Sequence, residues 1–424
     1  MGCRGRIKNG TQLIIMNEPT LLPHLFRMEY RKLVSVLCYR FGIGHIEIAE
    51  DIASDTFLSA SESWSINGLP ENPTAWLYTV AKNKTKNFLK RNALFEQKIT
   101  ADLKYSTEQS AEIEIDLSQK NIADSQLAMI FTVCNPAISS GSQVALALNL
   151  LCGFGPQEIA DAYLTNKEVV YKRINRAKEK LKEENIDIRQ PSIPEISSRL
   201  ETVLTTVYLL FSEGYYSISK DTTLRKDVCA EAMRLCLLLI ENEPTNTPQV
   251  NALYALMSFH ASRFDARLNE SGETILYEDQ DESLWNRELI EQGTFFLNKA
   301  ATGNDLSRYH LEAGIAYWHT QKSDTEEKWE NILQLYNHLL ILQYSPIAAL
   351  NRTFALAKVR GKQVAIIEAE KLGLDKNPFY HSLLGNLYTD IDKIKAVASY
   401  KKALELTTSP ADRQIINKHL AQLM

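Results

Sequence analysis

Residues 73–91 read PTAWLYTVAKNKTKNFLKR, and this stretch predicts a helix with two different sides. The apolar residues that recur in it at helical spacing are Trp76, Leu77, Val80, Ala81 and Phe88. Five Lys or Arg residues and no acidic residue fall within positions 82–91. The apolar side predicts packing on a core. The basic side, which also carries amides, is typical of a surface that binds nucleic-acid phosphates and bases, although a solvated lysine-rich helix has the same composition.

The preceding segment has the opposite charge. Residues 45–64 read HIEIAEDIASDTFLSASESW and predict a helix with one anionic side. Its first acidic residues are Glu47, Glu50, Asp51 and Asp55, and they are interleaved with Ile48, Ile52, Phe57 and Leu58. DNA would repel such a side. Two neighbouring helices of opposite charge therefore indicate two partners, of which one is a basic protein surface.

The order, spacing and charge of these two segments resemble region 2 of the extracytoplasmic-function class of bacterial sigma factors. The resemblance covers residues 23–92. It implies that the acidic element docks on the clamp helices of the polymerase β′ subunit and that the basic helix melts and reads the −10 promoter element. We expect the core-binding residues to be Glu47, Asp51, Ile52, Asp55 and Phe57, with Phe57 as an aromatic anchor. We expect the −10 contacts to be Asn83, Lys86, Asn87, Lys90 and Arg91, beside a base-capturing loop at residues 64–72.

A second basic helix is predicted at residues 166–182, NKEVVYKRINRAKEKLK. Thr165 and Glu168 have capping-box spacing, which predicts that the helix begins there. Its apolar stripe is Val170, Ile174, Ala177 and Leu181. The segment GPQEIADAYL before it predicts a shorter helix, so the pair forms either a helix-turn-helix or an ordinary surface hairpin.

This hairpin resembles region 4 of the same sigma class, which reads the −35 element and contacts the polymerase β flap. The resemblance implies that the longer helix lies in the major groove. We expect Lys167, Tyr171, Lys172 and Asn175 to face the bases. We expect Arg173, Arg176 and Lys178 to contact phosphates.

At 424 residues the chain has room for about three domains, and its segments predict an all-α protein. We expect a possible extra arm at residues 1–15, sigma region 2 at 16–94, a flexible linker at 95–122, sigma region 4 at 123–186 and a helical extension at 187–424. The segment that begins at Met16 is more typical of the start of such a protein than the segment that begins at Met1. The first 186 residues are nearly neutral and the remainder is acidic, so we expect DNA binding in the first part.

The extension carries a repeat-like pattern near its end. Residues 383–404 read LLGNLYTDIDKIKAVASYKKAL and approach tetratricopeptide spacing, with a fainter copy 31 residues earlier. The key residues are Leu384, Gly385, Tyr388, Ala396, Tyr400 and Ala403. Stacked helical hairpins of this kind present a concave surface, so a protein partner of the extension is expected. Residues 208–217 and 276–293 resemble the long extension of one subgroup of these sigma factors.

The remaining patterns point away from catalysis. The six cysteines and eight histidines are scattered, and no HExxH, P-loop, GxSxG or GxGxxG arrangement occurs. The acidic run Glu278, Asp279, Asp281 and Glu282 is better interpreted as the start of a helix than as a catalytic or metal site. We expect no cofactor, no bound metal, no membrane span and a cytoplasmic location.

Three functions are compatible with parts of this sequence pattern. The first is a sigma factor with a helical extension, and the second is a helix-turn-helix regulator whose tail senses a ligand or partner. The third is a helical scaffold that does not contact DNA. The second leaves the acidic helix without a role, and the third leaves both basic helices unexplained. The sequence therefore favours a sigma factor that binds core RNA polymerase and promoter DNA.

Overall fold

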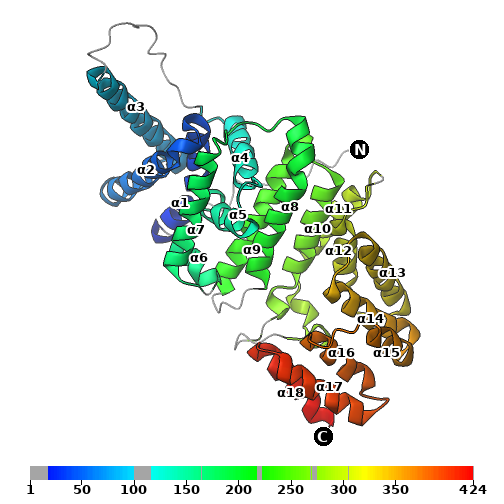
Figure 1. The fold of residues 1–424 in the computed structure, drawn as a ribbon. Coiled ribbons are helices and arrows are strands. Elements are labelled where there is room, and N and C mark those ends of the chain that lie inside the picture. Colours follow the sequence, from blue (N-terminus) through cyan, green and yellow to red (C-terminus); the bar gives the residue numbers. More distant parts are fainter. Residues whose placement is uncertain are drawn as a thin grey trace. The chain divides into compact units, whose positions relative to one another are not determined.

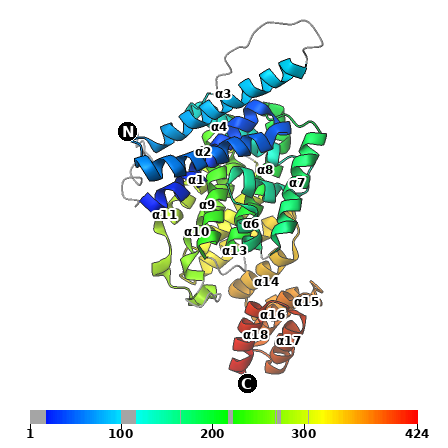
Figure 2. The ribbon, with the colours of Figure 1, turned by 90° about the vertical axis from the view of Figure 1, so that its left-hand side faces the viewer.

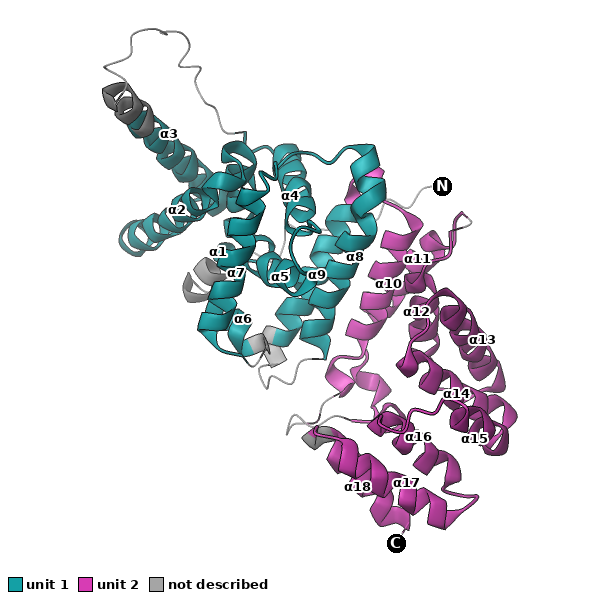
Figure 3. Ribbon diagram, in the orientation of Figure 1, with its two compact units in different colours: residues 1–239 teal, residues 240–424 magenta. Residues whose placement is uncertain are grey.

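The computed structural model describes residues 18–99, 116–163, 165–216, 222–267, 269, 275–303 and 305–423. These residues form helices and their connections, with no strand among them, so the all-α prediction is confirmed. The chain divides into two compact units, residues 1–239 and 240–424 (Figures 1 and 3). The predicted arm at residues 1–15 and positions 100–115 of the predicted linker lie outside the described residues.

The helices of the first unit are long where they carry the predicted sigma elements. In chain order they are α1 (Glu18–Phe41), η2 (Ile43–His45), α2 (Ile46–Asn67), α3 (Pro73–Ile99), α4 (Gln119–Val133), α5 (Ser140–Leu146), the π-helical turn η4 (Ala147–Leu151), α6 (Pro156–Tyr163), α7 (Lys167–Glu183), α8 (Ile193–Tyr215) and α9 (Thr222–Glu241). Helix α1 packs against both α2 and α4 (Figure 2).

The core of this unit forms around α1 because successive turns of that helix are apolar. Leu33, Val34 and Leu37 are almost completely buried. Arg31, only 1 % exposed, forms an ion pair with Glu231 of α9. The extension predicted to begin at residue 187 therefore contributes α8 and α9 to the same compact unit as α1.

Helix occupies both ends of the predicted linker. The helix α3 continues through Ile99, and α4 begins at Gln119 after Ser118, whose hydroxyl oxygen accepts a hydrogen bond from the backbone N–H of Asn121. Residues 95–99 lack Gly and Pro, so nothing in them stops the helix that precedes them.

The second unit is a succession of paired helices. Its helices are η5 (Glu243–Thr245), α10 (Pro248–Ser262), η6 (Asp265–Arg267), η7 (Tyr277–Asp279), η8 (Glu282–Leu284), α11 (Arg287–Ala300), α12 (Arg308–Trp318), α13 (Glu326–Leu342), α14 (Pro346–Arg360), α15 (Lys362–Glu370), α16 (Pro378–Tyr388), α17 (Lys393–Leu406) and α18 (Pro410–Leu423). From α12 onward each helix packs against the next in the chain, and α14 also packs against α16. This is the arrangement of a helical-repeat array.

The repeat-like residues form one core cluster. Leu384, Tyr388, Ala396, Tyr400 and Ala403 are all buried in it. Gly385 is required for this packing, because a Cβ atom there would lie 2.8 Å from the ring of Tyr400. The small residue thus lets α16 and α17 approach closely, as the sequence pattern predicts.

Replacement of Gly385 by Ala should destabilise the second unit. The added methyl group would overlap the buried Tyr400 ring, and overpacking of this kind costs about 1–3 kcal/mol. Thermal unfolding measures the effect, and G385A combined with Tyr400→Leu should recover part of the loss. Gly303 has open space around it but a positive φ, so an alanine there would be strained and would not be a clean control. Ala398→Gly, on the helix α17 that packs against the helix of Gly385, measures instead what an Ala/Gly exchange costs through helix propensity alone. An unchanged melting temperature for G385A would contradict the packing.

Candidate nucleic-acid and polymerase-binding surfaces

The basic side of α3 is free to meet a ligand. Leu77, Ala81 and Thr85 are buried along the opposite side of the helix. The five residues predicted to contact the −10 element are all exposed, namely Asn83, Lys86, Asn87, Lys90 and Arg91. The structure therefore brings these residues together on one solvent-facing surface of α3, which we call the α3 basic surface.

The loop before α3 is short and begins with a turn at a glycine. The predicted loop at residues 64–72 is shorter than expected, because its residues 64–67 continue α2 to Asn67. Gly68, which follows, adopts a positive φ of 75°, a conformation that favours glycine. Trp64 and Trp76 contact each other edge to face across this loop, with ring centroids 5.4 Å apart. Because of that contact, the loop at residues 68–72 is held at the start of α3, about three turns before Asn83, the first residue of the α3 basic surface.

Helices α6 and α7 pack together as a helical hairpin, and α7 has the predicted buried stripe. Val170, Ile174, Ala177 and Leu181 are at most 3 % exposed. The cap differs from the prediction by one residue, because the side chain of Asn166, not Thr165, accepts a hydrogen bond from the backbone N–H of Glu168 at 2.8 Å. The helix consequently begins at Lys167.

The residues expected to read the −35 element do not share one environment. Lys167, Tyr171, Lys172, Arg173 and Arg176 are exposed, and Asn175 is half-buried. Lys178 is only 7 % exposed, so α7 does not offer it to DNA in this arrangement of the chain. Tyr171 is 56 % exposed, so its ring is accessible to a ligand.

The acidic helix α2 places only part of the expected core-binding set on the surface. Asp51 and Asp55 are exposed, whereas Ile52 and Phe57 are 6 % and 5 % exposed. Phe57 packs edge to face on Phe26 with ring centroids 5.0 Å apart, so its ring faces the core and does not reach the surface.

Sequence reasoning missed the exposed apolar residue of this surface. Leu58 is 58 % exposed and lies three residues after Asp55, on the same side of α2 as Asp51 and Glu62. The spacing of four, three and four residues was the signal that could have found it. We call Asp51, Asp55, Leu58 and Glu62 the α2 acidic surface.

The remaining acids of α2 are paired with α7. The Nζ atom of Lys178 donates a hydrogen bond to Oε2 of Glu50 at 2.7 Å, and Nζ of Lys182 lies 2.8 Å from a carboxylate oxygen of Glu47. Both pairs join residues more than a hundred positions apart. One expected core-binding residue and one expected −35 residue are therefore engaged with the other helix.

The two pairs differ in their electrostatics. Burial raises the pKa of Glu50 above its ordinary value, although the charge of Lys178 acts in the opposite direction. Partial burial also acts to raise the pKa of Glu47, but the hydrogen bond and charge of Lys182, a backbone hydrogen bond and the charge of Lys178 together outweigh it, and the pKa is lowered. At neutral pH the Glu47 pair thus stabilises the contact, and it does so until the pH falls through the lowered pKa. Charged Glu50 weakens the contact through its desolvation.

Family comparisons agree with this geometry. The family described as Sigma-70 region 2 matches residues 25–94, which contain most of α1 and the whole of α2 and the α3 basic surface. The chain belongs to the sigma-70-type factors. As such a factor, it acts in transcription initiation with core RNA polymerase and promoter DNA as partners, and it is not an enzyme.

A second match covers part of the extension of this sigma factor. A family of unknown function (DUF6596) matches residues 199–301, from α8 through α11. An uncharacterized protein of Rhizobium meliloti (strain 1021) is 31 % identical over 387 residues, which covers 89 % of this chain and 90 % of that protein. No solved structure matches the chain.

The described residues of the sigma factor were also compared with the requirements of a membrane span and of a metal site. None of their helices has the length and apolar character that a membrane span requires. No group of three or more His, Cys, Asp or Glu side chains in these parts of the chain is arranged to hold a metal ion. Cys38, Cys134, Cys152, Cys229 and Cys236 are buried, and no disulfide bond joins any two of them.

Charge reversal should open the contact between α2 and α7. In K178E a carboxylate would face Glu50, and loss of a largely buried pair costs about 3 kcal/mol. Hydrogen–deuterium exchange should therefore rise in α7 and η2, which lie against each other. The double variant K178E/E50K should restore protection, because it reinstates the pair with reversed polarity.

Lys180 offers a matched control on the same helix. It is exposed and pairs with Glu184 within α7 at 2.7 Å, so K180E changes the charge equally without touching α2. Equal exchange rates in K178E and K180E would contradict the contact.

Proposed function

We propose that this sigma factor directs core RNA polymerase to promoters with both −10 and −35 elements, as its resemblance to the extracytoplasmic-function class implies. The observation that carries the proposal is the adjacency of the α2 acidic surface and the α3 basic surface on two packed helices. One surface fits a basic protein partner and the other fits nucleic acid, and a factor that joins polymerase to DNA needs both.

The α2 acidic surface is the proposed site for the β′ clamp helices. Three carboxylates surround the exposed side chain of Leu58, so a basic partner would meet both charge complementarity and an apolar contact. Asp55 lies 3.9 Å from Lys84 of α3, and an exposed pair at that distance contributes little by itself. Its carboxylate therefore remains available to a partner at small cost.

The α3 basic surface is the proposed contact with the separated −10 strand. Lys86, Lys90 and Arg91 neutralise phosphates, and the amides of Asn83 and Asn87 hydrogen-bond to unpaired bases. The loop at residues 68–72 lies at the start of α3, where it would receive a flipped base. Binding of this kind weakens steeply as salt is added, because it releases counterions.

The helix α7 is the proposed reader of the −35 element, with the β flap as its protein contact. Lys167, Tyr171 and Lys172 are exposed on its first turns, where a recognition helix contacts base edges. Arg173 and Arg176 lie beside them for phosphates. Lys178 joins this set only after it leaves Glu50, so the phosphate contact expected for it requires a rearrangement.

The contact between α2 and α7 is therefore proposed to be a closed resting arrangement of the sigma factor. In an initiation complex α7 would bind DNA upstream of the point at which α2 binds polymerase, and the pairs with Glu47 and Glu50 would be exchanged for those partners. The desolvation of Glu50 offsets part of the Coulomb attraction in this contact, which favours its opening. The protein acts in the cytoplasm, where polymerase and promoters are found.

The second unit is proposed to regulate in cis. It is a helical-repeat array with an interior surface, far larger than two DNA-binding elements need for stability. A regulatory extension of this size would take the place of a separate anti-sigma factor. A second protein that binds the extension would then control which promoters the sigma factor uses.

Run-off transcription with purified core polymerase tests the proposal as a whole. The template is the region upstream of the gene for this protein, and the reaction is run with and without the full chain. Transcripts that depend on the protein support a sigma factor. Promoter binding without any transcript would instead indicate a helix-turn-helix regulator and would overturn the proposal.

Reversal of the α2 acidic surface should abolish polymerase binding. D51K/D55K replaces two exposed carboxylates by lysines, so the basic partner surface would be repelled while the core of the unit stays intact. Gel filtration with core polymerase measures the association. E291K/D305K, which makes the same charge change at exposed positions of the second unit, is the control. Co-elution of D51K/D55K at the wild-type level would contradict the assignment.

Single substitutions on α7 should separate base readers from phosphate contacts. Y171A should cost about 1–3 kcal/mol and relax the preference at one −35 position, because a side chain at a base edge carries sequence information. R173A should weaken all promoters alike and reduce the salt dependence. A randomised −35 library transcribed by each reconstituted holoenzyme distinguishes the two, and the same uniform loss for both variants would reject the split.

A further inference from the structure

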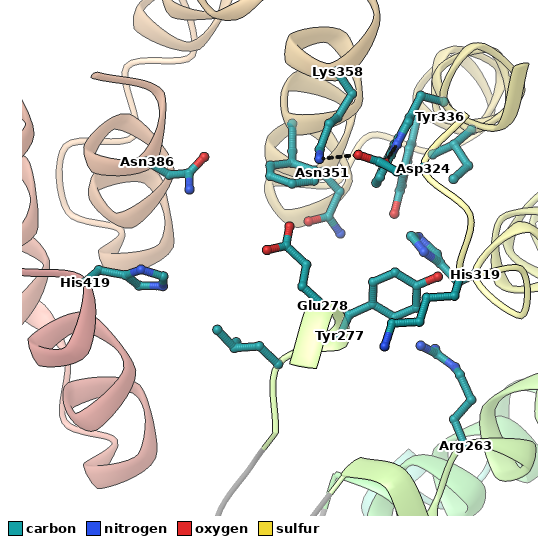
Figure 4. A pocket seen from close by; sticks show the side chains of 15 residues that line it. Arg263, Tyr277, Glu278, His319, Asp324, Tyr336, Asn351, Lys358, Asn386 and His419 are labelled. Carbon is teal, nitrogen blue, oxygen red and sulfur yellow. Dashed lines mark hydrogen bonds and ion pairs between the residues drawn. The ribbon is translucent and has the colours of Figure 1, made fainter. Parts of the chain in front are cut away.

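The second unit encloses a cavity that the sigma functions do not use. Its volume is about 710 Å³, within the range typical of small-ligand sites. The lining comes from the end of α10, the turns η7 and 319–324, and the helices α13, α14, α16 and α18. Figure 4 shows side chains from these separate elements converging on one space. The cavity therefore depends on the whole array.

Cationic groups dominate one end of the cavity. The guanidinium of Arg263 lies 5.4 Å from the centre of the Tyr277 ring, and its Nε atom is buried without a hydrogen-bond partner among the described residues. Lys322 also lines the space and donates a hydrogen bond to the backbone oxygen of Gln280. Behind Tyr277, the side chain of Lys328 is 1 % exposed and its Nζ donates to the Tyr277 hydroxyl at 3.0 Å.

The carboxylates of the lining do not cancel this charge. Asp324 accepts hydrogen bonds from the indole N–H of Trp329 and from Lys358, the latter at 3.0 Å (Figure 4). Its negative charge is therefore already balanced by the ammonium group of Lys358. Glu278 is the other lining carboxylate. Burial lowers the pKa of His319 to about 3, so its ring is neutral and adds no positive charge at physiological pH. Among the lining side chains, Arg263 and Lys322 thus outnumber Glu278, the carboxylate that remains.

Aromatic rings form the walls. Trp329 and Phe354 meet edge to face with ring centroids 5.6 Å apart, and Tyr277 meets His319 in the same way at 5.2 Å. Tyr336 completes the lining on α13. An anionic group alone would leave these rings in contact with water, so the cavity fits a ligand that joins an anion to an apolar or aromatic body.

Two amides favour a peptide as that ligand. Asn351 of α14 and Asn386 of α16 both line the cavity, and these two helices pack against each other in successive hairpins of the array. A side-chain amide donates and accepts hydrogen bonds at once, as a peptide group does. Asn351 is exposed into the space, where Figure 4 shows it close to Glu278. Each of the two amides could therefore bond to a peptide group of a bound chain.

We propose that this cavity binds a short peptide segment of a partner protein that presents a carboxylate next to an aromatic or large apolar residue. The carboxylate pairs with the Arg263 guanidinium, the apolar side chain packs against the wall formed by Trp329 and Phe354, and the Asn351 amide bonds to the peptide backbone. A free aromatic carboxylic acid shares the first two contacts and lacks the third. The inference does not depend on promoter or polymerase binding.

Fluorescence anisotropy on the full-length protein tests the inference. The probes are labelled hexapeptides that each contain one Asp, Glu or free C-terminal carboxylate beside one Phe, Trp or Leu, and unlabelled phenylacetate and indole acetate serve as competitors. Saturable peptide binding is expected, and it should weaken about ten- to a hundredfold in R263M because a charge-assisted hydrogen bond is lost. R263K should recover part of the affinity, and N351A should weaken peptides while leaving the small acids unchanged.

R360M is the matched control. Arg360 lies on the same helix as Asn351 and Lys358, pairs with Glu330 at the surface and is not part of the lining. It should bind peptides as the wild type does. Circular dichroism of each variant confirms that the fold is retained. Absence of any peptide binding, equal affinities for R263M and R360M, or binding of the small acids without the peptides would overturn the proposal.

Discussion

In the described parts of this sigma factor, a functional side chain is carried by a helix or by a short connection between helices, and each amphipathic helix must bury one stripe. That constraint decides which charges are available. On α3 the buried stripe of Leu77, Ala81 and Thr85 leaves the basic side free. On α2 the same requirement turns Phe57 inward and leaves Leu58 outside. A shift of one residue rotates a side chain by about 100°, so helix phase alone separates a core residue from a contact residue.

The second consequence of the constraint is that oppositely charged sides can meet within one chain. The helix α7 carries an excess of basic residues and α2 carries acids, and in the first unit they meet through Lys178 and Lys182. The same charges that suit each helix for an external partner make this internal pairing possible. A factor that must first hold and then release two binding elements benefits from a contact whose desolvation offsets much of its Coulomb attraction.

The second unit uses helix packing for a different purpose. Close approach at Gly385 lets α16 and α17 stack, and stacking of successive hairpins creates an interior that no single hairpin has. Within that interior the array gathers Arg263, Trp329 and Asn351 from three different helices or their ends. These residues are far apart in the chain, and they can act on one ligand only because the fold places them around the same cavity.

The sequence by itself determined the all-α class, the apolar stripe of α7, the exposed residues of α3 and the small-residue packing of α16 on α17. These features are local: periodicity and charge within one helix or hairpin are sufficient to place them. The start of α7 at Lys167, in contrast, depended on which of two adjacent polar residues reached the first backbone N–H groups. Only the tertiary structure decided that Lys178 is buried against Glu50, that α8 and α9 share a compact unit with α1, and that a cationic, aromatic cavity exists in the second unit. These features join residues more than a hundred positions apart or side chains from several helices, and no pattern within one segment records which other segment will cover it.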